Sequence, residues 1–214
     1  MSTRSQIWSA TRVVTCDPAR ATASDPLGTI EDGAVIVEGG RIAWIGPRGA
    51  APAADESFDG AGAVLTPGLV DAHTHAAWVG SRHAEYALRM AGGDYRAIAA
   101  AGGGIASSAR AVAAASEDEI ADVLARRLGR MARLGVTCVE VKSGYGLEPD
   151  GERKQLRAIA QASRRTELPA LVPTFLALHA LPAGLNRRDG LPFRKRLNKM
   201  LAEPGLNLCR RRRI

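Results

Sequence analysis

The stretch Val64-Leu-Thr-Pro-Gly-Leu-Val-Asp-Ala-His-Thr-His-Ala-Ala-Trp-Val-Gly80 decides how the rest of the chain is interpreted. Apolar residues lead through a Pro-Gly bend into Asp71-Ala-His73-Thr-His75. Because side chains alternate between the two faces of a strand, Asp71, His73 and His75 are expected to project to one side. Two imidazoles on one face can bind a single metal ion, each through one ring nitrogen. A histidine pair can also be ordinary surface, but the apolar strand before it favours a metal site, or half of one, with His73 and His75 as ligands.

At these residues the sequence resembles the amidohydrolase superfamily, metal hydrolases on a (β/α)8 barrel whose first strand ends in His-x-His. Further stretches narrow the resemblance to the imidazolonepropionase family, which opens the imidazolone ring in histidine degradation. The stretches that carry it are Thr66–His75, Gly80–Arg82, Ala101–Ile105, Val141–Leu147 and Thr174–Pro182. The likeness stops at about Gly184.

The resemblance implies an α/β fold, namely the first units of a (β/α)8, TIM-type barrel preceded by a small part of an N-terminal β-sandwich. Residues 1–63 would form the sandwich portion, residues 64–184 an incomplete barrel, and residues 185–214 a basic tail without resemblance. A whole barrel needs ~250 residues, whereas about 60 of the 214 residues here precede the first barrel strand. The chain is therefore too short for a complete barrel.

Local patterns agree with this organisation. Residues 7–14 are expected to form a strand, and Gly39-Gly40 predicts a hairpin between residues 34–38 and 41–45, because both turn positions need positive φ. Short helical patterns at residues 82–90 and 94–101 precede Gly102-Gly-Gly104, which we expect to be a mobile loop or a plain connector.

The second half of the chain alternates strands and helices. Ser116 and Glu119 form a capping box that opens a helix to Leu134, and Gly135 is expected to end it. A strand at residues 136–141, a helix from Pro149 to about Arg165 and a strand at residues 171–178 follow. Such alternation predicts a parallel sheet with polar groups at the carboxyl ends of its strands.

Three candidates for substrate binding lie after these strands. Arg82 can pair with a carboxylate or a polarised carbonyl, although an exposed arginine is also ordinary surface. Tyr145, between two glycines, can donate its phenol to a ligand oxygen or pack in the turn. His179 could be a third metal ligand or a substrate contact. The resemblance favours substrate binding for Arg82, Tyr145 and His179, while His83 has no motif support and is interpreted as surface.

The resemblance implies one bound ion, zinc or iron, and hydrolysis of the cyclic C–N bond of 4-imidazolone-5-propanoate to N-formimidoyl-L-glutamate. A catalytic site of this type needs three protein ligands and an open position for water. No histidine follows His179, and the family's acid/base residues come from later strands, so the catalytic residues are unknown and we expect this chain to be inactive. Another amidohydrolase, such as a deaminase or cyclic-amide hydrolase, remains an alternative.

The net charge of +7 is concentrated at the end of the chain. The last 30 residues carry ten Lys and Arg against two acids, and the remainder is nearly neutral. A basic tail could bind nucleic acid, which is the remote alternative function, but Phe193 is the single aromatic residue in the tail, so there is no pattern of aromatic residues interleaved with its charges. Because the family pattern breaks here, we expect residues from about Leu185 onward to come from a shifted reading frame, which the coding DNA downstream of codon 184 would test.

Three widely spaced cysteines without a C-x-x-C pattern are typical of reduced thiols. The sequence shows no signal-peptide pattern and no apolar run of ~20 residues. We therefore expect a cytoplasmic protein with a small-molecule substrate and with neither nucleic acid nor membrane as a partner. The resemblance implies a homodimer for the intact family.

Overall fold

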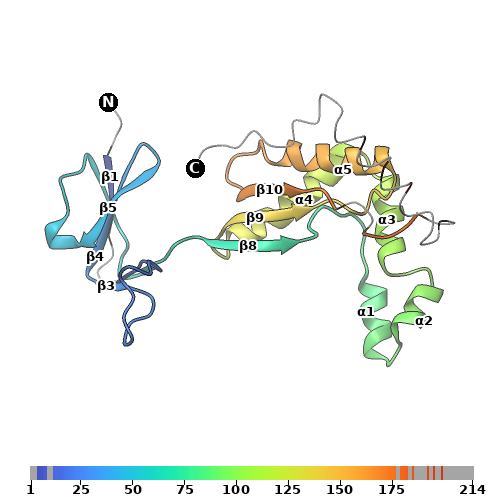
Figure 1. Ribbon diagram of the computed structural model, residues 1–214, viewed down its shortest axis with the longest axis horizontal. Coiled ribbons are helices and arrows are strands. Elements are labelled where there is room, and N and C mark those ends of the chain that lie inside the picture. The colour runs from blue at the N-terminus through green and yellow to red at the C-terminus, as the bar shows by residue number, and fades with distance from the viewer. Residues whose placement is uncertain are drawn as a thin grey trace. The chain divides into compact units, whose positions relative to one another are not determined.

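The computed structural model describes residues 4–8, 12–176 and 179–182, together with positions 185, 192, 195 and 199. The chain divides between Gly68 and Leu69 into two compact units. The first is built from β-strands, and the second combines a parallel sheet with helices (Figure 1). Within the described part of the chain, no helix has the length and apolar character needed to cross a membrane.

The N-terminal unit contains two small sheets. The four-stranded sheet has the order β5-β4-β1-β6 and consists of β1 (Arg4–Trp8), β4 (Gly33–Glu38), β5 (Arg41–Pro47) and β6 (Glu56–Asp59). The three-stranded sheet has the order β3-β2-β7 and consists of β2 (Arg12–Val14), β3 (Thr29–Glu31) and β7 (Val64–Leu65). A short 3-10 helix at Arg48–Ala50 follows β5.

The predicted hairpin is confirmed. Glu38 pairs with Arg41, and Gly39 and Gly40 have φ values of 60° and 75°. Both glycines lie in the left-handed region, where a side chain would be strained, so the turn depends on them.

Three strand boundaries differ from expectation. The strand expected at residues 171–178 is observed at Ala170–Thr174 and therefore ends earlier. Residues 7–14 are not one strand, because β1 pairs with β4 and β6 whereas β2 pairs with β3 and β7 in the other sheet. Val64 and Leu65 form β7 of the N-terminal unit rather than the start of the strand that carries the histidines. Pro67-Gly68 separates them from that strand, consistent with the lack of an N–H group on proline.

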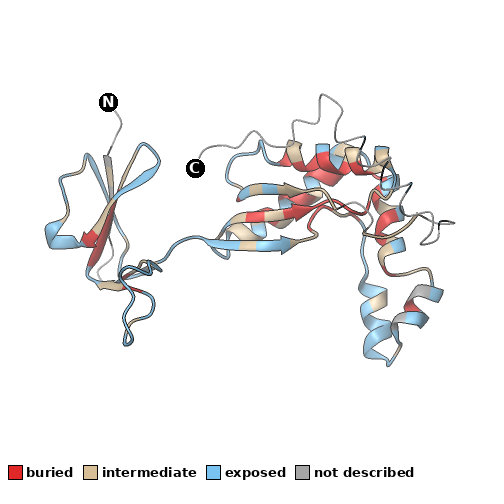
Figure 2. Cartoon of the chain, in the orientation of Figure 1, coloured by how far each residue is buried: buried red, intermediate tan, exposed pale blue. Residues whose placement is uncertain are grey.

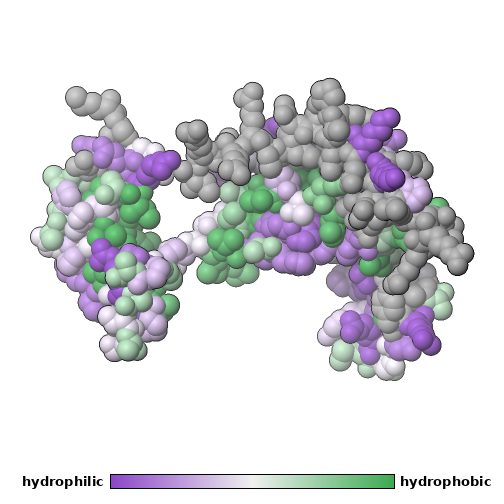
Figure 3. Space-filling view, viewed as in Figure 1, coloured by the Kyte–Doolittle hydropathy of each residue, from purple (hydrophilic) through white to green (hydrophobic). Residues whose placement is uncertain are grey.

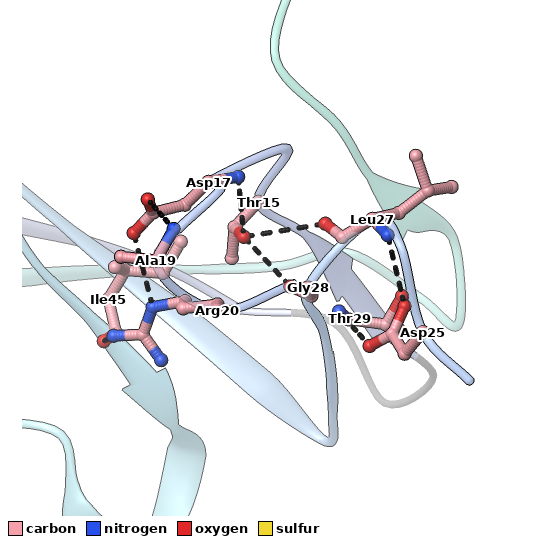
Figure 4. A network of polar contacts seen from close by, with 9 residues as sticks. All are labelled: Thr15, Asp17, Ala19, Arg20, Asp25, Leu27, Gly28, Thr29 and Ile45. Atoms are coloured by element: carbon pink, nitrogen blue, oxygen red, sulfur yellow. Dashed lines mark hydrogen bonds and ion pairs between the residues drawn. The ribbon is translucent and has the colours of Figure 1, made fainter. Parts of the chain in front are cut away.

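Side-chain hydrogen bonds hold the loop between β2 and β3 (Figure 4). Asp25 accepts hydrogen bonds from the Thr29 backbone N–H at 2.5 Å and from the Thr29 hydroxyl at 3.1 Å. The hydroxyl of Thr15 donates to the carbonyl of Gly28 at 2.8 Å, and Arg20 reaches the Ile45 carbonyl of β5 at 3.3 Å. The loop is thereby tied to both sheets of this unit.

The second unit is mixed α/β. Its parallel sheet has the order β10-β9-β8 and consists of β8 (Leu69–Thr74), β9 (Val136–Lys142) and β10 (Ala170–Thr174). Its helices are α1 (His83–Met90), α2 (Tyr95–Ala100), α3 (Ile105–Ala114), α4 (Glu117–Ala132) and α5 (Pro149–Ala162). These three strands do not close into a barrel within the described residues.

The core of this unit lies between the sheet and the helices α4 and α5 (Figure 2). Its fully buried large apolar side chains are Leu124, Leu128, Val139, Val141, Leu156 and Ile159. Each contributes roughly 1.5–3 kcal/mol relative to an exposed position. Since Val139 and Val141 face the helices, the alternation along β9 turns Glu140 and Lys142 to the opposite face of the sheet.

The helix signals of the second half are confirmed. The Ser116 hydroxyl accepts a hydrogen bond from the Glu119 backbone N–H at 3.1 Å, Gly135 has a φ of 86°, and Pro149 lies in the first turn of α5. Helix α3 was not predicted. Its buried positions include only one large apolar residue, Val112, which leaves a weak periodic pattern.

The start of β8 exposes apolar side chains. Leu69 and Val70 are 57% and 66% exposed, and Leu134, just before β9, is 77% exposed. Figure 3 shows the resulting hydrophobic surface over this end of the sheet. Strands β8 and β10 are the two edges of the sheet as described.

Replacing Ser116 with alanine is expected to destabilise the chain by about 1 kcal/mol, because the Glu119 N–H loses its acceptor. Urea denaturation followed by circular dichroism measures the change. Ser116→Asp, which keeps an acceptor at the same position, is the control and is expected to retain most of the stability. Equal losses in both variants would contradict the capping role.

Candidate functional site

Four aromatic rings gather at the carboxyl ends of the three parallel strands. His73 lies on β8 and His75 just after it, and their ring centroids are 5.7 Å apart. The ring of His179, after β10, stacks on His75 with a centroid distance of 4.5 Å. Tyr145, in the loop after β9, lies 5.8 Å from His75 and 5.5 Å from His179. Residues far apart in sequence therefore form one contiguous cluster, the ring cluster.

Arg82 lies outside the ring cluster, at the start of α1. Its Nε and Nη2 atoms donate to Glu85 Oε2 at 2.8 and 2.5 Å. The other Glu85 oxygen accepts from the Gly104 backbone N–H at 2.9 Å, so the predicted Gly102-Gly-Gly104 loop is anchored at its end. The charge of Arg82 acts to lower the pKa of Tyr145, against the larger effect of burial.

Burial sets the protonation of the ring cluster. It lowers the pKa of His75, and the neighbouring His179, Lys142 and His73 lower that pKa further. Burial also lowers the pKa of His179 and raises that of Tyr145. At neutral pH the two imidazoles are therefore uncharged and the phenol keeps its proton, so the cluster offers both lone pairs and a hydroxyl donor.

The donor set fits part of a metal site. His75 Nδ1 is buried and has no hydrogen-bond partner among the described residues. A buried polar atom normally has a partner, and a neutral imidazole nitrogen is a common metal ligand. However, the described residues contain no group of three or more His, Cys, Asp or Glu side chains placed to hold a metal. The histidine pair supplies two donors, fewer than a catalytic zinc site requires.

An ion pair within β9 lies beside the ring cluster, and its carboxylate is also hydrogen-bonded to β8. Lys142 Nζ lies 2.5 Å from Glu140 Oε1, and the Thr74 backbone N–H donates to Glu140 Oε2 at 3.1 Å. Burial alone would raise the pKa of Glu140, but hydrogen bonds from Lys142, Thr174 and Thr74 hold it below its ordinary value. The carboxylate stays ionised and fixes the end of the strand that carries the histidines.

Two buried polar side chains of α5 hold the loop that carries Tyr145. Glu152 accepts hydrogen bonds from the backbone N–H groups of Gly144 and Leu147, both at 2.9 Å. Gln155 accepts from those of Tyr145 and Gly146 at 3.1 and 3.2 Å. Burial raises the pKa of Glu152. Its hydrogen bonds with the Ser143 side chain and with the backbone N–H groups of Leu147, Gly144 and Gly146 oppose this increase.

The residues after His75 are held from the helical side. Arg127 donates to the carbonyl of Ala76 at 2.7 Å and to that of Trp78, and its guanidinium stacks on the Trp78 ring at 3.8 Å.

Asp71 Oδ1 accepts from the backbone N–H of His73 at 3.3 Å. Asp71 thus contacts the backbone of the histidine motif.

Sequence reasoning missed the supporting residues Arg127, Glu140, Glu152 and Gln155. One signal could have found two of them. Glu152 and Gln155 share the helical face of Leu156 and Ile159, so they are polar residues at core positions, which require buried partners.

Proteins of known function resemble this chain over most of its length. It is 48% identical to an imidazolonepropionase of Caulobacter vibrioides over 179 residues, 83% of this chain and 43% of that protein. It is 44% identical to an imidazolonepropionase of Shewanella sediminis over 181 residues, with the same shares. It is 40% identical to one of Shewanella sp. strain ANA-3 over 200 residues, 92% of this chain and 48% of that protein, so the likeness to this relative continues past Gly184, where it was expected to stop. The chain thus spans less than half the length of these relatives. No family model matches it.

Solved structures show the same arrangement of elements. Ochratoxinase of A. niger superposes with a TM-score of 0.54 at 17% identity, covering 89% of this chain and 36% of that one. An atrazine chlorohydrolase of Arthrobacter aurescens superposes with a TM-score of 0.51 at 20% identity, covering 79% of this chain and 35% of that one. At these identities the likeness concerns the fold alone.

The stability of the chain is expected to fall as the pH drops through about 6.5, the ordinary value for histidine. The pKa values of His75 and His179 are lowered in the folded state, so the unfolded chain binds protons that the folded chain resists. The contribution of the two histidines to the free energy of unfolding is fully present above pH 6.5. It decreases as the pH falls towards their lowered pKa values.

Urea denaturation with a chelator present, at pH values from about 8 to 5.5, measures this slope. His179→Asn should flatten it, and the exposed His83→Asn is the control. An unchanged slope in His179→Asn would contradict the burial of this imidazole.

Proposed function

We propose that this chain, a partial-length homologue of the imidazolonepropionases in the amidohydrolase superfamily, supplies the first strands of such an enzyme's barrel with part of its metal and substrate sites. The observation that carries the proposal is the ring cluster, in which His73, His75, Tyr145 and His179 converge from three strand ends. A barrel enzyme carries its chemistry at this end of its strands.

His73 and His75 would hold one ion, zinc or iron. When bound, such an ion lowers the pKa of a coordinated water to about 7 and so supplies a nucleophile for a C–N bond. The lowered pKa of His75 supports the proposal, because a ligating imidazole must be neutral. The unpartnered Nδ1 atom of His75 supports it as well.

Arg82, Tyr145 and His179 would bind the substrate. The proposed 4-imidazolone-5-propanoate carries a carboxylate, which a guanidinium binds well, and a ring carbonyl, which a protonated phenol can hydrogen-bond. Burial keeps the phenol of Tyr145 protonated. The Tyr145 ring lies 5.8 Å from His75 and 5.5 Å from His179, so a ligand bound by the phenol would also lie beside these imidazoles.

The parent reaction would be hydrolysis of the substrate to N-formimidoyl-L-glutamate. Because the described residues offer two histidine donors, we expect the 214-residue chain to bind metal weakly and to lack turnover. Monodisperse protein that hydrolyses imidazolonepropionate would contradict this. We also propose a cytoplasmic location and, for the intact relatives, a homodimer.

Replacing both His73 and His75 with alanine is expected to weaken Co²⁺ binding by at least about tenfold, since both proposed donors are removed. Isothermal titration calorimetry on the full chain, with Co²⁺ as the probe, measures the affinity. The control is His83→Ala, which removes an exposed imidazole of α1. If the double variant binds as the unaltered chain does, the histidine pair is not the site.

Tyr145→Phe is expected to weaken binding of hydantoin-5-propionate, which carries both a ring carbonyl and a carboxylate, by about fivefold, the loss of one hydrogen bond of ~1 kcal/mol. Chemical-shift titration of the full chain measures the dissociation constant. Tyr86→Phe is the control, because Tyr86 is exposed on α1. Equal affinity in Tyr145→Phe would reduce Tyr145 to a packing residue of the loop.

A further inference from the structure

Gln155 joins two of the three segments that carry the ring cluster. Its side chain is fully buried on α5, with 0% exposure. The carbonyl oxygen accepts from the backbone N–H groups of Tyr145 and Gly146 at 3.1 and 3.2 Å. The amide nitrogen donates to the Ala77 carbonyl at 2.5 Å. One side chain thereby bonds the loop after β9 and the segment two residues beyond His75.

We propose that Gln155 is a positioning residue that fixes Tyr145 beside His75. The inference rests on the proposed function, in which these two residues serve the same ligand. Their rings lie 5.8 Å apart and are carried by segments separated by about 70 positions in sequence. A site that binds one ligand through two loops depends on their relative placement to within about 0.5 Å.

The three hydrogen bonds require a side-chain amide with the length of glutamine, because one atom must accept and the other must donate. A carboxylate could accept from Tyr145 and Gly146 but would repel the Ala77 carbonyl oxygen. A methionine would fill a similar volume and make none of the three bonds. The buried Tyr145 N–H would lose its acceptor, and the half-buried Gly146 N–H would lose one of its acceptors. A purely space-filling role would tolerate methionine, whereas a positioning role would not.

Glu152 provides an internal comparison. It accepts hydrogen bonds from Gly144 and Leu147, on either side of the residues that Gln155 contacts, but within the described part of the chain it makes no hydrogen bond to Ala77. Glu152 therefore shapes the tyrosine loop itself. Gln155 sets where that loop lies with respect to the histidine segment.

Hydrogen–deuterium exchange on the full chain tests the inference. In Gln155→Met, the amides of Tyr145 and Gly146 are expected to exchange about tenfold faster or more, with β9 and α5 unchanged. In Gln155→Glu these amides should stay protected, while exchange in residues 76–79 increases. Because the second variant retains two of the three bonds, it keeps the test usable if the first fails to fold.

Gln161→Ala is the matched control. Gln161 lies on the same helix, and its amide donates to Asp118 of α4 at 2.8 Å on the exposed side. This variant is expected to leave exchange in both loops unaltered. Faster exchange spread evenly over β9 and α5 in Gln155→Met, or no faster exchange at all, would overturn the inference.

Binding of hydantoin-5-propionate, which carries a ring carbonyl and a carboxylate, separates this inference from the proposed function. Gln155→Met is expected to weaken binding about tenfold, whereas Gln161→Ala is not. If the unaltered chain does not bind the probe, the proposed function fails and the inference fails with it. If the chain binds the probe and Gln155→Met binds it equally well, the inference alone is overturned.

Discussion

The parallel alignment of β8, β9 and β10 is the constraint on which the rest of the second unit depends. Parallel strands place their carboxyl ends at one edge of a sheet, so His75, Tyr145 and His179 meet although more than thirty positions separate each from the next. Helices α4 and α5, which lie in the connections between the strands, bury the face of β9 that carries Val139 and Val141. They thereby fix the order of the strands. Neither the ring contacts nor the buried loop supports would exist if one strand were reversed.

Features with a local physical cause could be predicted from the sequence. The Ser116 cap, the Gly39-Gly40 turn and Pro149 at the start of α5 each depend on a few neighbouring residues, and each was found as expected. The alternation of strands and helices likewise follows from short apolar patterns. The meeting of histidines and tyrosine followed from combining these local features with the geometry of parallel sheets.

Features that depend on distant partners could not be predicted. Whether residues 7–14 serve one sheet or two is decided by strands that lie elsewhere in the chain, and so is the pairing of Val64 and Leu65 with β2. Glu152 and Gln155 show the same limitation at the site. Their positions mark them as buried, but their partners are backbone amides of a loop whose course only the folded chain defines.

Gly146 and Gly151 touch backbone to backbone where the tyrosine loop meets α5. A Cβ atom on Gly146 would lie 2.2 Å from the carbonyl carbon of Gly151, and one on Gly151 would lie 2.3 Å from the Gly146 carbonyl oxygen. Glycine in a helix costs about 1 kcal/mol relative to alanine, yet here every alternative is excluded sterically. Purifying selection would therefore retain glycine at both positions for a steric reason, and a comparison of related genes would show two conserved glycines whose role is the close approach of two backbones.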